Sequence, residues 1–172
     1  MHSVLVYPSA YVGKTASELS SGLWTEGEQP RGGESWRHGP VVLTWDHVRS
    51  GAAEIADGHN IVFHEFAHQL DEEEGPTDGT PALGQRSRYI AWAKVLGAEY
   101  DQLRRDVERH RLTLLDEYGA TKPWEFFAVA TECFFEKPLQ LQQRHPEMYD
   151  QLKEFYRQDP VQYFGELGKR QP

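Results

Sequence analysis

The segment IVFHEFAHQLD, residues 61–71, constrains the fold of this chain more than any other feature of the sequence. Asn60 precedes it, and asparagine is a favoured residue at the cap before a helix. We therefore expect a helix that begins after Asn60, runs through Leu70 and ends near Gly75. Its phenylalanine, alanine and leucine side chains must pack on a core, which fixes where the interspersed histidines point.

His64, Glu65 and His68 in this segment form the pattern H-E-x-x-H. Positions four apart on a helix lie on one face, so the two imidazoles can bind one Zn²⁺ ion at about 2.0–2.1 Å. Zinc lowers the pKa of a bound water to about 7, and a neighbouring carboxylate can then accept the proton of that water. The spacing therefore predicts a hydrolytic zinc site with Glu65 as general base. The competing interpretation is an amphipathic helix with incidental histidines.

A catalytic zinc requires a third protein ligand, and one apolar segment offers two candidates. Residues 124–135, WEFFAVATECFF, contain Glu125 and Glu132. Burial of a carboxylate costs free energy unless the group is paired or binds a metal, so either glutamate is a candidate metal ligand. Because the two lie about 10 Å apart along a helix, one ion does not readily take both. Spacing leaves the choice between them open, although a solvated position at a helix end suits Glu125 better than Glu132.

The remainder of the chain predicts an α+β fold that is mostly helical, with a small N-terminal sheet. Short strands are expected at 4–7 and 41–45. Residues 13–39, rich in Gly, Ser, Glu and Arg, are expected to be irregular. Further helices are expected at 88–111, 124–136 and 148–156. We expect residues 1–172 to form a single domain, in which 1–50 are partly irregular and 51–172 are mainly helical.

Charge and cysteine content narrow the classes of partner. The net charge is −9, so a phosphate backbone would be repelled and nucleic acid is not an expected ligand. No apolar run approaches the roughly 20 residues that span a bilayer, and the N-terminus has no basic flank typical of a signal peptide, so no membrane partner is expected. Cys133 is the only cysteine, which excludes an internal disulfide and fits a cytoplasmic location.

Two blocks of sequence together are more specific than H-E-x-x-H alone. They are HEFAHQLD, residues 64–71, and YGATKPWEFFAVATECFF, residues 118–135. With them the chain resembles, over about 41–156, the Mlc titration factor A family of zinc peptidases. The catalytic core of that family is similar to the peptidase domain of anthrax lethal factor. The resemblance implies a zincin-like core, in which the H-E-x-x-H helix packs against a second helix that bears a glutamate.

The resemblance also implies roles for single residues. Glu125 opens the E-[FC]-F-A block and matches the third zinc ligand of the family. Tyr118 matches a tyrosine seven positions earlier, whose hydroxyl would stabilise a developing oxyanion. Glu132 and Asp71 match acidic positions that would orient a histidine or support packing. Family members carry a longer N-terminal region, so this chain is expected to lack that extension.

The predicted function is that of a zinc peptidase with aminopeptidase-like activity on peptides or small amides. Residues 41–45 either present a strand edge to an extended peptide or form a core strand without a free edge. The alternative function is a regulatory one, because the family name implies sequestration of a transcriptional repressor, with the zinc site secondary. Glu65 favours the enzyme, since metal binding alone does not require a general base.

Overall fold

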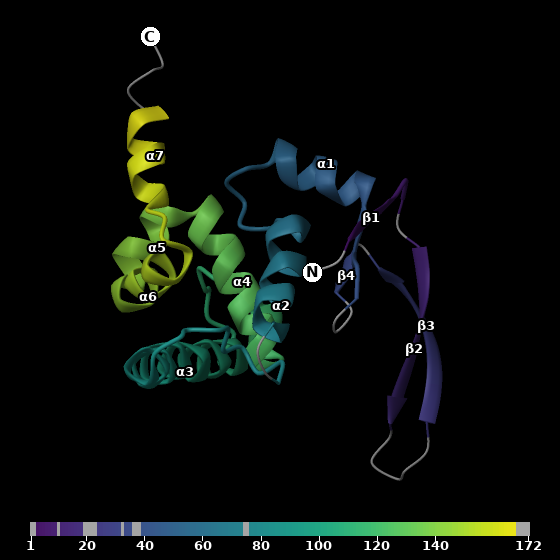
Figure 1. Ribbon diagram of the computed structural model, residues 1–172, viewed down its shortest axis with the longest axis horizontal. Coiled ribbons are helices and arrows are strands. Elements are labelled where there is room, and N and C mark those ends of the chain that lie inside the picture. The colour runs from purple at the N-terminus through teal and green to yellow at the C-terminus, as the bar shows by residue number, and fades with distance from the viewer. Residues whose placement is uncertain are drawn as a thin grey trace.

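A computed structural model describes residues 3–9, 11–18, 24–31, 33–35, 39–73 and 76–167 of the chain. It shows the predicted α+β fold, with strands gathered at the N-terminal end and a helical body beside them (Figure 1). The strands are β1 (Val4–Tyr7), β2 (Tyr11–Glu18), β3 (Trp24–Arg31), β4 (Gly33–Ser35) and β5 (Val41–Thr44). The helices are α1 (Trp45–Ala53), α2 (Ile61–Glu72), α3 (Arg86–Glu108), the 3₁₀ turn η1 (Glu117–Ala120), α4 (Pro123–Glu136), α5 (Pro138–Arg144), α6 (Pro146–Tyr156) and α7 (Pro160–Leu167).

Strand β5 occupies the middle of a three-stranded sheet in the order β1-β5-β4. It pairs in parallel with β1, from Val4 opposite Val41, and antiparallel with β4. All residues of β5 are buried, as expected for a strand covered on both sides. The strand predictions at 4–7 and 41–45 are therefore confirmed, except that Trp45 already belongs to α1. The idea that 41–45 present a free edge is wrong, because both edges of β5 are paired.

The prediction that residues 13–39 are irregular is wrong for the part of this segment that the structure describes. There β2 and β3 form a two-stranded antiparallel ribbon, with Tyr11 opposite Arg31 and Glu18 opposite Trp24. The two strands pair through their backbones. Their sequences lack the alternation of apolar and polar residues from which a strand is usually predicted. Pro30 lies in β3 opposite Val12, and proline within sheets is confined to strands that have an unpaired edge, as both strands of this ribbon do.

Helices α2 and α4 pack against one another at the centre of the molecule (Figure 1). As predicted, α2 begins after Asn60, whose side chain accepts hydrogen bonds from the backbone N–H groups of Val62 and Phe63 at 3.1 and 3.3 Å. Its last residue is Glu72, and the predicted end near Gly75 lies outside the described residues. Pro123 opens α4 as expected, since its fixed φ suits the first helical turn.

The core is built around α4, which buries ten of its residues. Trp92 of α3 packs edge-on against Phe127 of α4 and Phe155 of α6, with 5.6 Å between ring centroids in each pair. Helix α3 begins two residues and ends three residues earlier than predicted, and it ends before His110, where the chain turns with a φ of +53°. No helix in the described part of the chain is long and apolar enough to cross a bilayer.

Candidate metal centre

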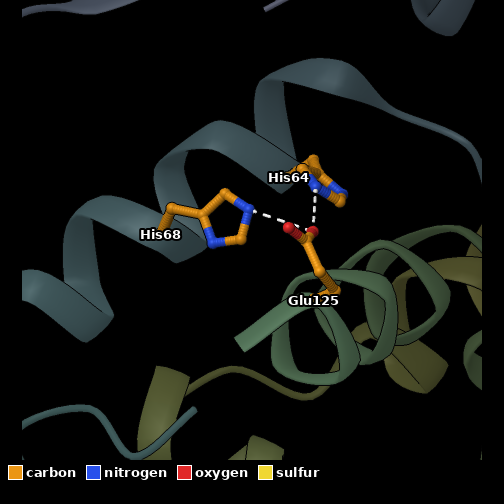
Figure 2. A group of neighbouring side chains, drawn as sticks. All are labelled: His64, His68 and Glu125. Atoms are coloured by element: carbon orange, nitrogen blue, oxygen red, sulfur yellow. Dashed lines mark hydrogen bonds and ion pairs between the residues drawn. The ribbon is translucent and has the colours of Figure 1, made fainter. Parts of the chain in front are cut away.

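The H-E-x-x-H helix and the glutamate at the start of α4 bring three ligand-type side chains to one point (Figure 2). Nε2 of His64 lies 3.1 Å from Oε2 of Glu125, and Nε2 of His68 lies 3.3 Å from the same oxygen. One ligand atom from each residue lies within 4.8 Å of the other two. All three side chains are only 12–13% exposed, so the group is partly shielded from water.

These distances fit a zinc ion. Donor atoms placed about 2.0–2.1 Å from a tetrahedral zinc lie roughly 3.3–3.4 Å apart, close to both observed nitrogen–oxygen separations. Two imidazoles and a carboxylate are also a donor set that catalytic zinc uses. Among the described residues, this is the group of histidine and acidic side chains that can hold a metal. The fourth position would remain open for a water or a substrate.

Protons compete with a cation for these three side chains. Burial alone lowers the pKa of His64, but hydrogen bonds to Glu125 and Glu132 outweigh it and raise that pKa from 6.5 to about 10. Burial raises the pKa of Glu125, but hydrogen bonds from His64 and His68 outweigh it and lower the pKa from 4.5 to about 2. A proton on His64 and a charge on Glu125 thus stabilise each other, and a metal must displace that proton.

Glu65 is 5% exposed and belongs to the same helix as the two histidines. Burial raises the pKa of its carboxyl, and the positive charges of His64 and His68 partly oppose that rise. A carboxyl whose pKa is moved upward in this way is a better proton acceptor than an ordinary glutamate. Glu65 is therefore a buried carboxyl of raised pKa on the helix that carries both histidines.

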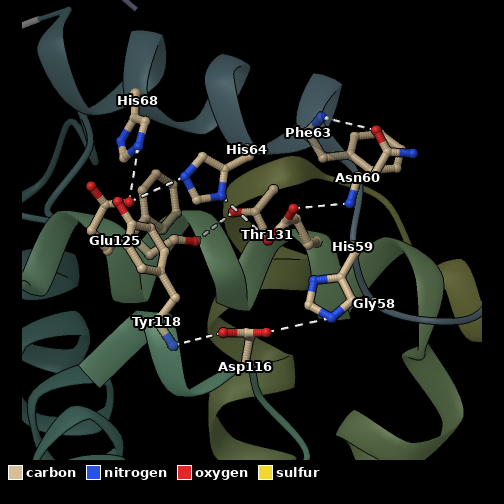
Figure 3. Close-up of polar contacts among 12 residues, drawn as sticks. Gly58, His59, Asn60, Phe63, His64, His68, Asp116, Tyr118, Glu125 and Thr131 are labelled. Atoms are coloured by element: carbon tan, nitrogen blue, oxygen red, sulfur yellow. Dashed lines mark hydrogen bonds and ion pairs between the residues drawn. The ribbon is translucent and has the colours of Figure 1, made fainter. Parts of the chain in front are cut away.

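Tyr118 lies in η1, where its ring centroid is 6.1 Å from that of His64 (Figure 3). Burial and the nearby charge of Glu125, to which the hydroxyl donates a hydrogen bond, raise the pKa of Tyr118 to about 12. The phenol is therefore a protonated donor at neutral pH. Asp116 holds the turn in place, since its side chain accepts a hydrogen bond of 2.7 Å from the Tyr118 N–H.

The second candidate third ligand, Glu132, is on the other side of the His64 ring. Its Oε2 lies 3.3 Å from Nδ1 of His64, whereas Glu125 faces Nε2. Glu132 therefore contacts a ligand-type histidine and is not part of the three-residue group. The structure thus distinguishes the positions of Glu125 and Glu132, which helical spacing alone could not do.

Asp71 supports the fold next to the site. Its Oδ2 accepts a hydrogen bond of 2.8 Å from the N–H of Gly79. Gly79 has a φ of +84°, and a Cβ there would lie 2.4 Å from the carbonyl oxygen of Pro123, so only glycine fits. The Asp71 contact therefore fixes the loop that packs against Pro123 at the start of α4, two residues before Glu125.

Two structural features near the site are not among the predictions from the sequence. Glu136 is 4% exposed and accepts hydrogen bonds from Asn60 and Gly58, and Asp116 pairs with His59 at 3.4 Å while capping η1. A signal for Glu136 was present, because Glu132 and Glu136 lie four apart on a helix that is otherwise apolar. Cys133 is buried, and burial raises the pKa of its thiol to about 12, which opposes a nucleophilic role.

Comparison with known proteins identifies the family. Residues 1–157 match the family described as glucose-regulated metallo-peptidase M90. The chain belongs to this family. It is 41% identical over 162 residues to the uncharacterized protein slr2042 of Synechocystis sp., which covers 94% of this chain and 59% of that protein. It is 35% identical over 163 residues to Mlc titration factor A of Yersinia enterocolitica, with coverage of 93% and 60%.

Membership in the M90 family confirms the resemblance drawn from the two sequence blocks. The chain spans about three-fifths of the length of the curated relatives that it matches. The M90 family is one of metallopeptidases, so a metal ion is implied, and the group formed by His64, His68 and Glu125 offers a place for it.

Proposed function

We propose that this M90 chain is a zinc-dependent peptidase with His64, His68 and Glu125 as the zinc ligands. The observation that carries the proposal is the convergence of two imidazole Nε2 atoms and one carboxylate oxygen beside a buried glutamate. Zinc held there supplies a Lewis acid that acidifies a water and polarises a carbonyl. The ligand side chains are fixed by two packed helices, which preorganises the site.

Glu65 is proposed to move the proton. Its carboxylate accepts a proton from the attacking water and later donates it to the departing amine of the substrate. Its position on α2 fits this role, because neighbouring positions on a helix point in different directions and Glu65 stays out of the three-ligand group. Burial of this carboxyl costs free energy, and metal binding alone does not require the residue. Its presence therefore favours an enzyme.

Tyr118 is proposed to donate a hydrogen bond to the developing oxyanion. We expect Tyr118→Phe to lower kcat by about 100-fold, since removal of one oxyanion donor costs roughly 2.7–4 kcal/mol. Zinc content should not change, because Tyr118 is not one of the ligand-type residues of the group. Steady-state kinetics with an aminoacyl reporter amide measure the effect. Tyr163→Phe, which alters an exposed tyrosine on α7, is the matched control and should leave kcat unchanged.

The substrate class proposed is a peptide or small amide, with aminopeptidase-like cleavage. Strand β4 is an outer strand of the described sheet and packs against α2 (Figure 1). An extended peptide that added to the outer side of β4 by backbone hydrogen bonds would run beside the helix that carries His64 and His68. The peptide-binding edge that we propose therefore belongs to β4 and not to the central strand β5.

A second candidate function is regulatory. Several relatives bear the name Mlc titration factor A, which indicates that those proteins titrate a regulator. This chain would then bind a transcriptional repressor, and the metal centre would be secondary. The buried Glu65 favours the peptidase, because a protein that only sequesters a partner has no use for a general base at a metal site.

Removal of the metal tests the proposal. We expect dialysis against a chelator to abolish hydrolysis of an aminoacyl reporter amide, and one equivalent of Zn²⁺ to restore it. The thermal unfolding temperature should rise on zinc addition, because a ligand that binds only the folded state stabilises it. Hydrolysis that survives complete zinc removal, or a protein that takes up no zinc, would refute the zinc peptidase.

A further inference from the structure

Two buried carboxylates of α4 bind the start of the H-E-x-x-H helix. Oε1 of Glu132 accepts a hydrogen bond from the Asn60 N–H at 2.9 Å. One turn later, Glu136 accepts from the Asn60 side-chain amide at 2.9 Å and from the Gly58 N–H at 3.0 Å. Both glutamates are no more than 5% exposed. The cap of α2 is therefore held by the same helix that carries Glu125.

Glu132 differs from Glu136 in the use of its second oxygen. Its Oε2 lies 3.3 Å from Nδ1 of His64, so this nitrogen can donate its hydrogen to the carboxylate. Once a metal has displaced the proton that lies between Nε2 and Glu125, the hydrogen that remains on Nδ1 leaves the lone pair of Nε2 to the metal. A carboxylate on the far nitrogen of a metal-binding histidine fixes both tautomer and ring orientation.

We propose that Glu132 is a positioning residue that presents Nε2 of His64 to the metal and ties this orientation to the start of α2. The inference rests on the proposed zinc site and adds to it a residue that is not a ligand. One carboxylate reaches both the cap of the helix and the ring of His64, four positions further along it. Any shift of the helix start relative to α4 would therefore also move the ring.

His68 shows that this support is specific. Its Nδ1 is buried and has no hydrogen-bond partner among the described residues. The two histidines therefore differ: the ring of His64 is held from behind by a carboxylate, and that of His68 is held by packing and by Glu125. We expect the affinity of the site to depend on Glu132 through His64 alone.

Glu132→Gln changes the tautomer preference at almost constant shape. The amide oxygen would still accept from the Asn60 N–H, and the amide NH₂ would then face Nδ1 of His64 and donate to it. Such donation favours the hydrogen on Nε2, which blocks the metal-binding lone pair. We expect the dissociation constant for Zn²⁺, measured by competition with a chromophoric chelator, to rise about 10- to 100-fold.

Glu136→Gln is the matched control. It removes the same charge one turn away and disturbs the same loop, but Glu136 has contacts to Asn60 and Gly58 rather than to His64. We expect it to lower the thermal unfolding temperature of the chelator-treated protein while zinc affinity changes less than threefold. Glu132→Gln should lower that temperature no more than Glu136→Gln does, so that affinity and stability separate.

If the parent protein binds zinc, three results would overturn the inference. They are unchanged zinc affinity in Glu132→Gln, an equal loss of affinity in Glu136→Gln, and a zinc-loaded parent protein in which Nδ1 of His64 carries no hydrogen. Long-range ¹H–¹⁵N spectra of histidine-labelled parent protein show which ring nitrogen of His64 carries the hydrogen. This measurement tests the inference even if Glu132→Gln does not fold. A parent that binds zinc without hydrolysing any substrate would refute the peptidase but leave this inference standing. A parent that binds no zinc would refute both.

Discussion

Glu65→Gln is expected to lower kcat for an aminoacyl reporter amide by about 10²- to 10⁴-fold, the usual contribution of a general acid–base group. The amide cannot accept a proton from the attacking water, although it has the shape of the carboxylate. Zinc binding should survive, because Glu65 lies outside the three-residue group that would hold the ion. The observable is therefore a fall in kcat at full zinc occupancy, measured by kinetics together with metal analysis.

The control for this substitution is Glu73→Gln, which removes a charge from an exposed residue just after α2. It should leave both kcat and zinc content unchanged. Equal hydrolysis by zinc-loaded Glu65→Gln and parent protein would show that Glu65 is not the base. The regulatory alternative makes a different prediction, since a protein that only binds a repressor would keep its repressor affinity when Glu65 is replaced.

The sequence predicts those parts of the fold that strong local signals determine. The cap at Asn60 places α2, and Pro123 places the start of α4, because each residue has a backbone preference that tertiary contacts need not override. Helical spacing also brings His64 and His68 to one face whatever the rest of the chain does. Hence the histidine half of the site follows from the sequence alone.

The remaining features depend on contacts between distant segments. The β2–β3 ribbon is specified by backbone pairing, which leaves no periodic pattern in its Gly- and Glu-rich sequence. Local propensity can indicate that β5 is a strand, but it does not determine that β1 and β4 are its neighbours in the sheet. The choice between Glu125 and Glu132 depends on how α4 crosses α2, since either carboxylate could face the histidines until the packing of the two helices is known.

Glu125→Gln is expected to weaken Zn²⁺ binding by about 10²- to 10³-fold. A zinc site with four protein ligands binds with about 10–16 kcal/mol, so one ligand is worth roughly 2.5–4 kcal/mol, and about 1.4 kcal/mol corresponds to tenfold in affinity. Competition with a chelator measures the loss. Glu117→Gln, which removes an exposed charge from η1, is the control and should leave affinity unchanged. Undiminished affinity in Glu125→Gln would exclude this residue as a ligand.

The pH dependence of zinc binding gives Glu125 a second test. The pKa of His64 is raised from 6.5 to about 10, because hydrogen bonds to Glu125 and Glu132 outweigh the opposing effect of burial. Below that pKa, a zinc ion must displace a proton from His64, so affinity in the parent protein should rise about tenfold per pH unit between pH 6 and 8. Glu125→Gln removes one of the two acceptors that raise this pKa, so His64 loses its proton at lower pH. The rise should therefore flatten toward pH 8 in the variant, whereas Glu117→Gln should retain the parent slope, and equal slopes in all three proteins would show that Glu125 does not hold the proton on His64.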